Sequence, residues 1–289
     1  MASLATHLSA FLFLIPTGLR RLLCSSSLYL KTPSIYKSKT WFFSEPRWKN
    51  LDFYILIIAL PLSSFSETFI FLTFSSGHPT YRFAFLQQSM VVFLFWVLLL
   101  LIILRENVDP LYINEAFVFI FAGLTFLAEY FVMGKGLTGL SSTAYDLLGA
   151  LTLVCAGCSF YLSVKPSAFF AEFLLSTGLV FKGTWILQSG LSLYTDTFGF
   201  KGCQKVMVLP GKENADMGCD LEEDGFRAVA LMRLLFTGHA ILVLLLSFGL
   251  FGLLSKNQNL RFGDGGGPLL SQVDSENMLM RTSAELEIE

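Results

Sequence analysis

The sequence predicts an all-α, multi-pass integral membrane bundle of seven transmembrane helices. Seven long apolar segments alternate with short segments that carry charged or turn-forming residues. Of the 289 residues, 54% are hydrophobic and only 15% are charged, and the mean hydropathy is +0.62. These values lie outside the usual range of soluble domains. They exclude a soluble α/β fold, and the cations are scattered between the apolar segments rather than gathered in a patch suited to nucleic acid.

Each apolar segment is long enough to cross a bilayer as a helix. A spanning helix needs about 20 predominantly apolar residues to cross a hydrocarbon core of about 30 Å. In chain order, the predicted spans are 4–23, 51–74, 83–104, 113–133, 143–164, 168–194 and 226–254. We expect the first span to be retained, because Arg20 and Arg21 follow its apolar run where a signal peptide would have a small-residue cleavage site.

The chain is predicted to divide into a membrane domain and a tail. Residues 1–254 hold the seven spans, whereas residues 255–289 are polar, pass through a glycine-rich stretch and end in an acidic segment. Such a composition is typical of a flexible segment. We therefore expect a flexible cytosolic tail that offers a surface to membrane or cytosolic protein partners.

The distribution of Lys and Arg predicts the orientation. The segment between the first two spans carries a concentration of cations, and alternate loops counted from it hold more Lys and Arg than the loops on the other side. Because short cytoplasmic loops are enriched in these residues, the N-terminus is predicted to be outside or lumenal and the C-terminus cytosolic. This orientation fits the plasma membrane and the endomembranes alike.

Polar side chains within the spans are the main functional candidates, since ionisable groups in hydrocarbon are costly and usually face a bundle interior. Helical rise places the candidates in the outer half of the membrane or near its middle. They predict a polar cavity that opens outward. The alternative is a set of separate interhelical hydrogen bonds and ion pairs. The candidate cavity residues are Glu67, Gln88, Glu129, Asp146, Lys182, Gln188, Arg233 and His239.

The cysteines fall into two groups. Cys203 and Cys219 lie in the longest loop, which the predicted orientation places in an oxidising compartment. A disulfide between them is expected there. Cys155 and Cys158 lie inside the fifth span, where we interpret them as small packing residues.

An enzymatic function is not expected. The chain has no P-loop, dinucleotide fingerprint or nucleophile elbow, and its three histidines lie on separate elements, which argues against haem. The enzymatic alternative is a metal-dependent membrane hydrolase, whose ligands would come from His7, His239, Glu67 and Glu129. We predict no metal site and no cofactor.

The sixth span carries the segment Gly183-Thr184-Trp185-Ile186-Leu187-Gln188-Ser189-Gly190. Gly183 and Gly190 are seven residues apart and lie on nearly the same helical face, so small residues there allow a neighbouring helix to approach closely. Thr184 and Gln188 form an i, i+4 pair on an adjacent face. We interpret this segment as a packing seam with a polar anchor.

This segment resembles the G-T-W-x-x-Q-x-G motif of the transmembrane protein 45 family, in particular its plant, viral-response-like branch. Further similar stretches are Thr6–Leu19, Phe85–Ser89 and Gly202–Ala230. The chain departs from the family pattern at Ala10 and Phe11, which replace Pro-Gly, and at Gln88, which replaces a His. The resemblance covers residues 6 to 254 and implies a multi-pass membrane protein without an assigned catalytic activity or cofactor.

These observations predict an interaction or trafficking role in the membrane, with the lipid bilayer as the constant partner. The alternative is a transporter or sensor of a small solute or proton that uses the predicted polar cavity. Glu67 and Glu129 distinguish these two functions. Their charges are needed for transport or sensing through a polar cavity, but not for contact with a partner at the protein surface.

Overall fold

The computed structural model describes residues 4–43, 50–73, 79–107, 113–134, 139–195, 200–203 and 219–263. Helices are the regular elements of these residues, which confirms the all-α prediction for this part of the chain. The helices are α1 (Leu4–Lys31), the short 3-10 helix η1 (Pro33–Ile35), α2 (Leu51–Thr73), α3 (Pro79–Asn107), α4 (Glu115–Val132), α5 (Gly139–Val164), α6 (Phe169–Tyr194) and α7 (Glu222–Gly263).

Six of these helices, α1 and α3 to α7, are long and apolar enough to cross a membrane. The helix α2 has 23 residues, but its described apolar part, Leu51–Ser66, is shorter than a full span. The prediction of a helical membrane bundle is therefore supported by six candidate spans. A seventh span at α2 stays a prediction.

Two helices are longer than the sequence predicted. Helix α1 continues through Arg20 and Arg21 to Lys31, and its arginines do not end it because they are neutralised inside the bundle, as described below. Helix α7 continues beyond residue 254 to Gly263, and the rest of the predicted tail lies outside the described residues. The chain divides into two units, 1–248 and 249–289, and the site lies within the first.

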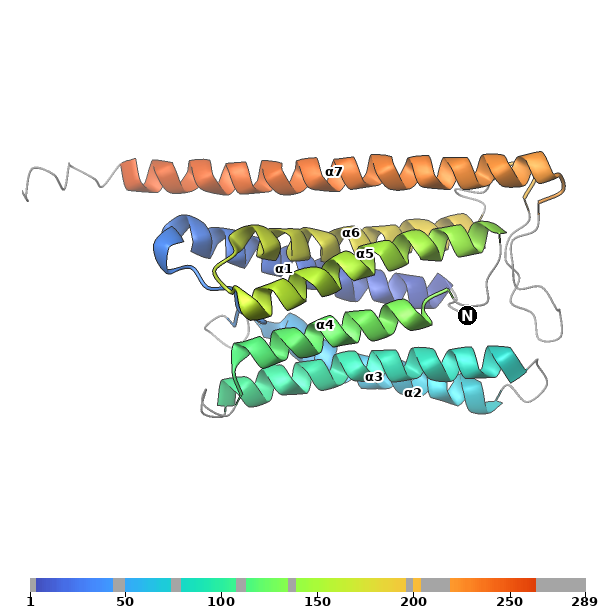
Figure 1. Ribbon diagram of the computed structural model, residues 1–289, viewed down its shortest axis with the longest axis horizontal. Coiled ribbons are helices and arrows are strands. Elements are labelled where there is room, and N and C mark those ends of the chain that lie inside the picture. The colour runs from blue at the N-terminus through green and yellow to red at the C-terminus, as the bar shows by residue number, and fades with distance from the viewer. Residues whose placement is uncertain are drawn as a thin grey trace, which may run out of the picture. The chain divides into compact units, whose positions relative to one another are not determined.

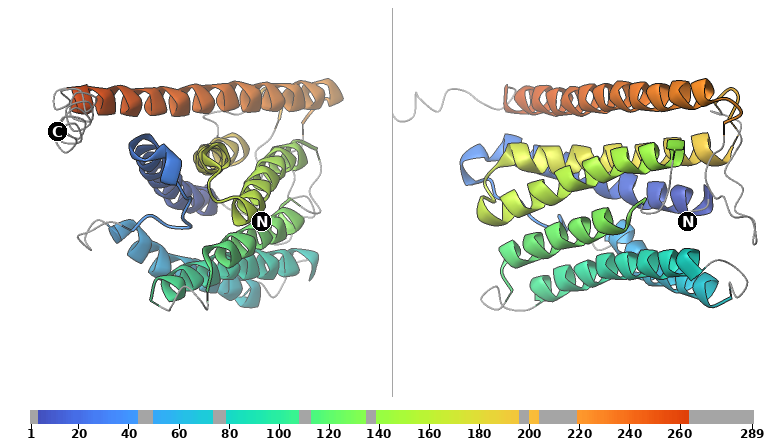
Figure 2. Two further views of the ribbon diagram at one scale, coloured as in Figure 1. Left: turned by 60° about the vertical axis from the view of Figure 1, so that its left-hand side comes forward. Right: turned by 45° about the vertical axis from the view of Figure 1, so that its right-hand side comes forward.

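Consecutive helices of the first unit run in opposite directions (Figure 1). Helix α6 packs between α1 and α5, and α4, α3 and α2 follow as successive neighbours (Figures 1 and 2). We call the end near Arg20, Arg21 and Arg105 the arginine end, and the end near Cys203 and Cys219 the disulfide end. At the arginine end, the segment 36–43 leads from α1 back toward α2, and we call it the return loop.

Glycines allow α1 and α6 to pack closely. A Cβ atom on Gly18 would lie 2.8 Å from the backbone nitrogen of Val180, and one on Gly190 would lie 2.7 Å from Cβ of His7. A Cβ atom on Gly183 would lie 3.0 Å from Cβ of Leu14. The glycines of the G-T-W-x-x-Q-x-G segment thus face α1, and Gly18 extends this seam from the α1 side.

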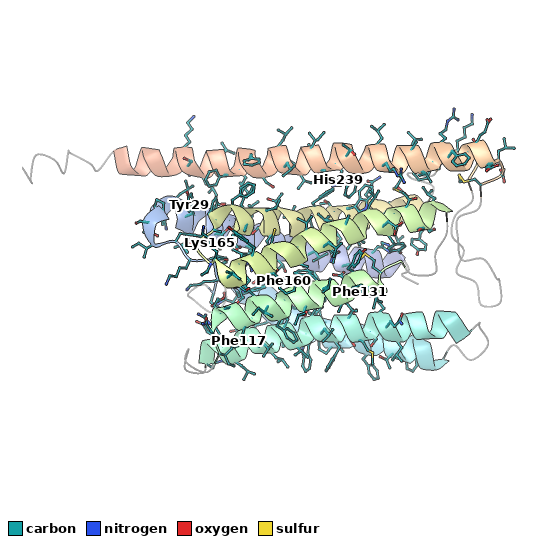
Figure 3. All side chains as sticks on the ribbon, viewed as in Figure 1. Tyr29, Phe117, Phe131, Phe160, Lys165 and His239 are labelled. Atoms are coloured by element: carbon teal, nitrogen blue, oxygen red, sulfur yellow. A yellow bond between two sulfur atoms is a disulfide. The ribbon has the colours of Figure 1, made fainter. Side chains whose placement is uncertain are left out.

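Helix α7 contacts α6 through large side chains. Trp185 is fully buried, and its ring centroid lies 4.9 Å from that of Phe236. His239 Nε2 lies 2.8 Å from Thr184 Oγ1, and Figure 3 shows His239 on the side of α7 that faces α6. The opposite side of α7 is exposed and mainly apolar, as expected for a helix that faces lipid.

Candidate functional site

A cavity of about 240 Å³ lies between the helices of the first unit. Its wall comes mainly from α1, α2, α3, α4 and α6, and most of the lining side chains are apolar. Ala10, Val91, Phe95, Phe126 and Leu179 are examples. Such a chamber resembles the sites of small ligands, which are usually apolar with a few well-placed polar groups.

One polar feature of the cavity wall is an ion pair between α6 and α4. Lys182 Nζ donates a hydrogen bond to Glu129 Oε2, and Lys182 is 1% exposed. The ammonium also lies 5.3 Å from the centre of the Phe126 ring, which adds a cation–π attraction. Because both charges are neutralised by each other, the pair can face an apolar chamber and still offer hydrogen bonds to a ligand. Gln88 also lines the cavity. At the arginine end the wall also includes Arg20 and Arg21, whose carboxylate partners are described below.

At the arginine end, Arg21 and Glu172 form a second buried ion pair. Arg21 Nε lies 2.6 Å from Glu172 Oε1, and Arg21 Nη2 donates to Glu172 Oε2 over 2.7 Å. The Glu172 side chain is fully buried, and Ser38 and Ser176 also donate hydrogen bonds to it. This bidentate contact joins α1 to the first turn of α6. The carboxylate of Glu172 also lies near the positive end of the α6 helix dipole, which stabilises its negative charge.

The neighbouring residue Arg20 joins α1 to the start of α2. Its guanidinium lies 2.5 Å from the Asp52 carboxylate and donates to Asn50 Oδ1 over 2.6 Å. It also donates to the carbonyl of Phe42 over 2.7 Å. Arg20 and Arg21 therefore point to different sides of α1, and each has a carboxylate partner.

These arginines, together with Glu115 and Arg105, hold the return loop against the bundle. Arg21 donates to the carbonyl of Thr40 over 2.7 Å, and the Thr40 hydroxyl donates to Glu115 over 2.6 Å. Arg105 from the end of α3 completes the set with a 2.7 Å contact to Glu115. Thr40, Trp41 and Phe42 also line the cavity, so the return loop forms part of its wall at the arginine end.

Aromatic packing anchors the beginning of the return loop. The Tyr36 ring is buried and meets Phe169 edge-on at 5.6 Å. Burial raises the pKa of the Tyr36 hydroxyl, and the nearby Glu172 carboxylate raises it further, so the side chain stays neutral at physiological pH. The backbone N–H of Ser38 donates to the carbonyl of Pro166 over 2.7 Å, which ties the loop to the α5–α6 connection.

The eight residues expected to line one polar cavity are distributed over several places. Gln88, Glu129 and Lys182 line the cavity. His239 bonds to Thr184 at the α6–α7 contact, Gln188 is half-buried on α6, and Asp146 and Arg233 are exposed. The side chain of Glu67 lies outside the described residues. The expectation of a single polar cluster therefore needs correction, because helical phase turns several of these side chains to other faces.

His7, one of the residues considered above as a metal ligand, packs against aromatic side chains of the neighbouring helices. His7 is buried between α1, α5 and α6, with its Nε2 atom 3.3 Å from the Tyr145 hydroxyl and its ring 5.4 Å from that of Tyr194. His239 and Glu129 lie in the different surroundings given above. Within the described residues, no three His, Cys, Asp or Glu side chains gather closely enough to hold a metal ion.

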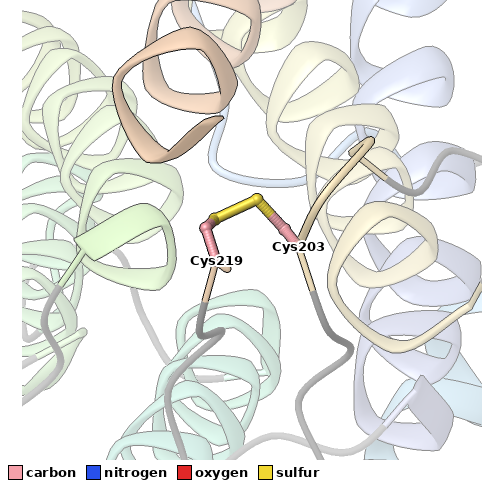
Figure 4. The surroundings of a disulfide bond; sticks show 2 residues. All are labelled: Cys203 and Cys219. Atoms are coloured by element: carbon pink, nitrogen blue, oxygen red, sulfur yellow. A yellow bond between two sulfur atoms is a disulfide. The ribbon is translucent and has the colours of Figure 1, made fainter. Parts of the chain in front are cut away.

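A disulfide joins Cys203 to Cys219 at the disulfide end (Figure 4). This is the pair that the sequence analysis expected. The two cysteines also form an isolated backbone bridge, which brings the chain after α6 next to the start of α7. Cys155 and Cys158 are buried free cysteines in α5, and Cys155 Sγ would lie 3.1 Å from a Cβ atom on Gly178.

Sequence reasoning missed the network at the arginine end. It used the arginines there only for the orientation of the chain and for the retention of the first span, and it did not consider Glu172, Asp52 or Glu115. A signal was present, because each of these carboxylates lies at or near the first residue of a predicted span, and the arginine pair lies inside an apolar helix. Charges in such places require partners.

Part of the chain matches a known protein family. Residues 115–252 match a family of unknown function, DUF716. This segment covers α4, α5, α6 and most of α7, and it includes the Lys182–Glu129 pair and the G-T-W-x-x-Q-x-G segment. A search of curated proteins finds no match for the chain.

Proposed function

We propose that this protein is a multi-pass membrane protein that binds a small, mainly apolar ligand in its bundle cavity, as a sensor or carrier. The observation that carries the proposal is the chamber of about 240 Å³ with the Lys182–Glu129 pair on its wall. Its volume is below the roughly 300–1,000 Å³ of most drug-sized sites. The ligand is therefore small, with a polar group that can hydrogen-bond to the ion pair or Gln88.

The same chamber is poorly suited to a free ion. Its lining is mainly apolar, and its charged side chains already have partners. Lys182 pairs with Glu129, and the lining residues Arg20 and Arg21 pair with Asp52 and Glu172. A desolvated charge there would therefore lack a free compensating group. Transport of a charged solute, one form of the function predicted from the sequence, is thus less well supported than binding of an apolar molecule. No catalytic role is part of the proposal.

The family assignment is also a proposal. The G-T-W-x-x-Q-x-G segment and the order of the other similar stretches resemble the transmembrane protein 45 family. The match to DUF716 includes this segment and the stretch Gly202–Ala230, whereas the similar stretches in α1 and α3 precede it. An interaction or trafficking role, which the sequence predicted first, stays a prediction. It is compatible with a ligand cavity, because a bound ligand can change the affinity of a membrane protein for its partners.

Filling the cavity tests the binding function. Ala122 lines the cavity from α4, and we expect Ala122→Trp to lower ligand access strongly because the indole would occupy the chamber. The probe is a decanol that carries a diazirine and an alkyne, added to vesicles that contain the full-length protein. After photolysis, mass spectrometry should find labelled peptides from α1, α3, α4 and α6, and Ala122→Trp should reduce this labelling at least about fivefold.

The matched control is Leu124→Trp, two residues further along α4, where the native side chain is 51% exposed. This variant should label like the unmodified protein, and excess unlabelled decanol should compete with the probe in both. Labelling confined to outward faces of the helices, with no response to Ala122→Trp in folded protein, would remove the proposal. Ala122→Leu fills less of the same chamber and replaces Ala122→Trp if the larger side chain prevents folding, with a smaller but still measurable loss of labelling expected.

The predicted orientation has its own test. The excess of Lys and Arg at one end favours an orientation in which the disulfide end lies outside or in a lumen. An N-glycosylation acceptor engineered into 205–215 should therefore be modified in microsomes, whereas one placed in 270–280 should not. Modification of the second site and not the first would reverse the orientation and place the return loop on the outer side.

A further inference from the structure

Arg233 is an unpaired charge on the outward face of α7. It is exposed and lies beside Leu234 and Leu235, which are 67% and 42% exposed. At 1.5 Å per residue it is about 16 Å along the helix from Glu222, inside the apolar segment of α7. Among the described residues it has no ion-pair partner. A guanidinium at this depth is unfavourable unless something neutralises it.

Asp146 is the corresponding unpaired carboxylate, on the outward face of α5. It is exposed, and it accepts a hydrogen bond from Ser142 on its own helix over 3.2 Å. It lies about 10 Å along α5 from Gly139. The described carboxylates inside the bundle have cationic partners, and these are Asp52, Glu115, Glu129 and Glu172.

We propose that two copies of the protein form a two-fold dimer in which Arg233 of each copy pairs with Asp146 of the other. Both residues lie toward the disulfide end, about 16 Å and about 10 Å from the starts of their helices, a difference of about 6 Å that the long Arg233 side chain can span. A two-fold axis along the membrane normal leaves every depth unchanged, so two such ion pairs form reciprocally. Because Arg233 on α7 and Asp146 on α5 carry opposite charges, a second copy of the same chain is the partner that neutralises both. The dimer goes beyond the proposed ligand site and does not depend on it.

The outward face of α5 suits close contact with another helix. Exposed residues recur along it at helical spacing as Asp146, Ala150, Leu153, Gly157 and Tyr161. Nothing lies within 4 Å of a Cβ atom placed on Gly157, so the space beside it is open. Small residues on such a face let a neighbouring helix approach closely in a membrane, which brings Asp146 within reach of the long Arg233 side chain.

Charge reversal and charge exchange test the dimer. The full-length protein is reconstituted in phosphatidylcholine vesicles at a series of densities, and its dimer fraction is measured by single-molecule photobleaching. We expect the unmodified protein to be dimeric and Arg233→Glu to raise the dissociation constant at least about tenfold. The exchanged pair Arg233→Asp with Asp146→Arg should restore the dimer. Arg227→Glu, on an exposed residue nearer the start of α7, should leave it unchanged.

Cross-linking tests the same contact without relying on charge-reversed protein. Copies with Arg233→Cys and copies with Asp146→Cys carry different tags and are oxidised together in the vesicles. A mixed disulfide dimer is expected, and it should be absent when Leu124→Cys, on an exposed face of α4, replaces Asp146→Cys. The inference fails if the unmodified protein is monomeric at every density, which would mean that Arg233 extends to the lipid headgroups. It also fails if the mixed disulfide does not form.

Discussion

Replacing Glu172 by glutamine is expected to lower the free energy of unfolding by about 3–5 kcal/mol, because it leaves the buried Arg21 guanidinium without its counter-charge. Glu172 is fully buried, and the Arg21 side chain is 11% exposed, so water cannot replace the lost partner. The same change weakens the hold on the return loop, since Ser38 and Arg21 both contact Glu172. The measurement is the unfolding of purified protein in mixed detergent and SDS micelles, followed by tryptophan fluorescence.

The control is Glu106→Gln. Glu106 pairs with Arg105 across 3.1 Å, but its side chain is 50% exposed, and exposed pairs contribute only about 0–1 kcal/mol. The double replacement Arg21→Met with Glu172→Met should recover most of the loss, because an apolar pair of similar volume carries no unpaired charge. Equal losses for Glu172→Gln and Glu106→Gln would contradict the role of Glu172 as a buried anchor.

The helices were largely predictable because their signal is local. Each span is a long apolar run with polar flanks, and the predicted bounds of the third to sixth spans lie close to those of α3 to α6. The errors are at positions where tertiary contacts decide. Helix α1 extends past Arg20 and Arg21 because Asp52 and Glu172 neutralise them, and no local pattern shows that those partners are near.

The candidate site was less predictable, since its pairs join distant parts of the chain. Depth along a helix placed Lys182 and Glu129 among the eight candidate cavity residues, but it could not show which way each polar side chain points. Asp146 and Arg233 have depths similar to those of the cavity residues and yet face outward. The apolar character of the chamber could not be predicted either, because its lining side chains come from helices that are far apart in the sequence.

The second large effect is expected for Gly18→Ala. A Cβ atom at this position would lie 2.8 Å from the backbone nitrogen of Val180 and 3.1 Å from Cβ of Leu179. A backbone atom in the middle of α6 cannot rotate away, so the two helices must separate along their seam. Such overpacking typically lowers the free energy of unfolding by about 1–3 kcal/mol. Separation also disturbs Lys182 and Leu179, which face the cavity from the same helix.

The matched substitution is Gly238→Ala, also a glycine in the middle of a helix. No atom lies within 4 Å of its added Cβ, so the change should be neutral or stabilising by up to about 1 kcal/mol through helix propensity. Both variants are measured by the same detergent unfolding, and the yield of monodisperse protein gives a second readout. If Gly18→Ala were as stable as Gly238→Ala, the close approach of α1 to α6 at Val180 would be wrong. The G-T-W-x-x-Q-x-G segment would then need another explanation, because Gly183 and Gly190 face the same helix along the same seam.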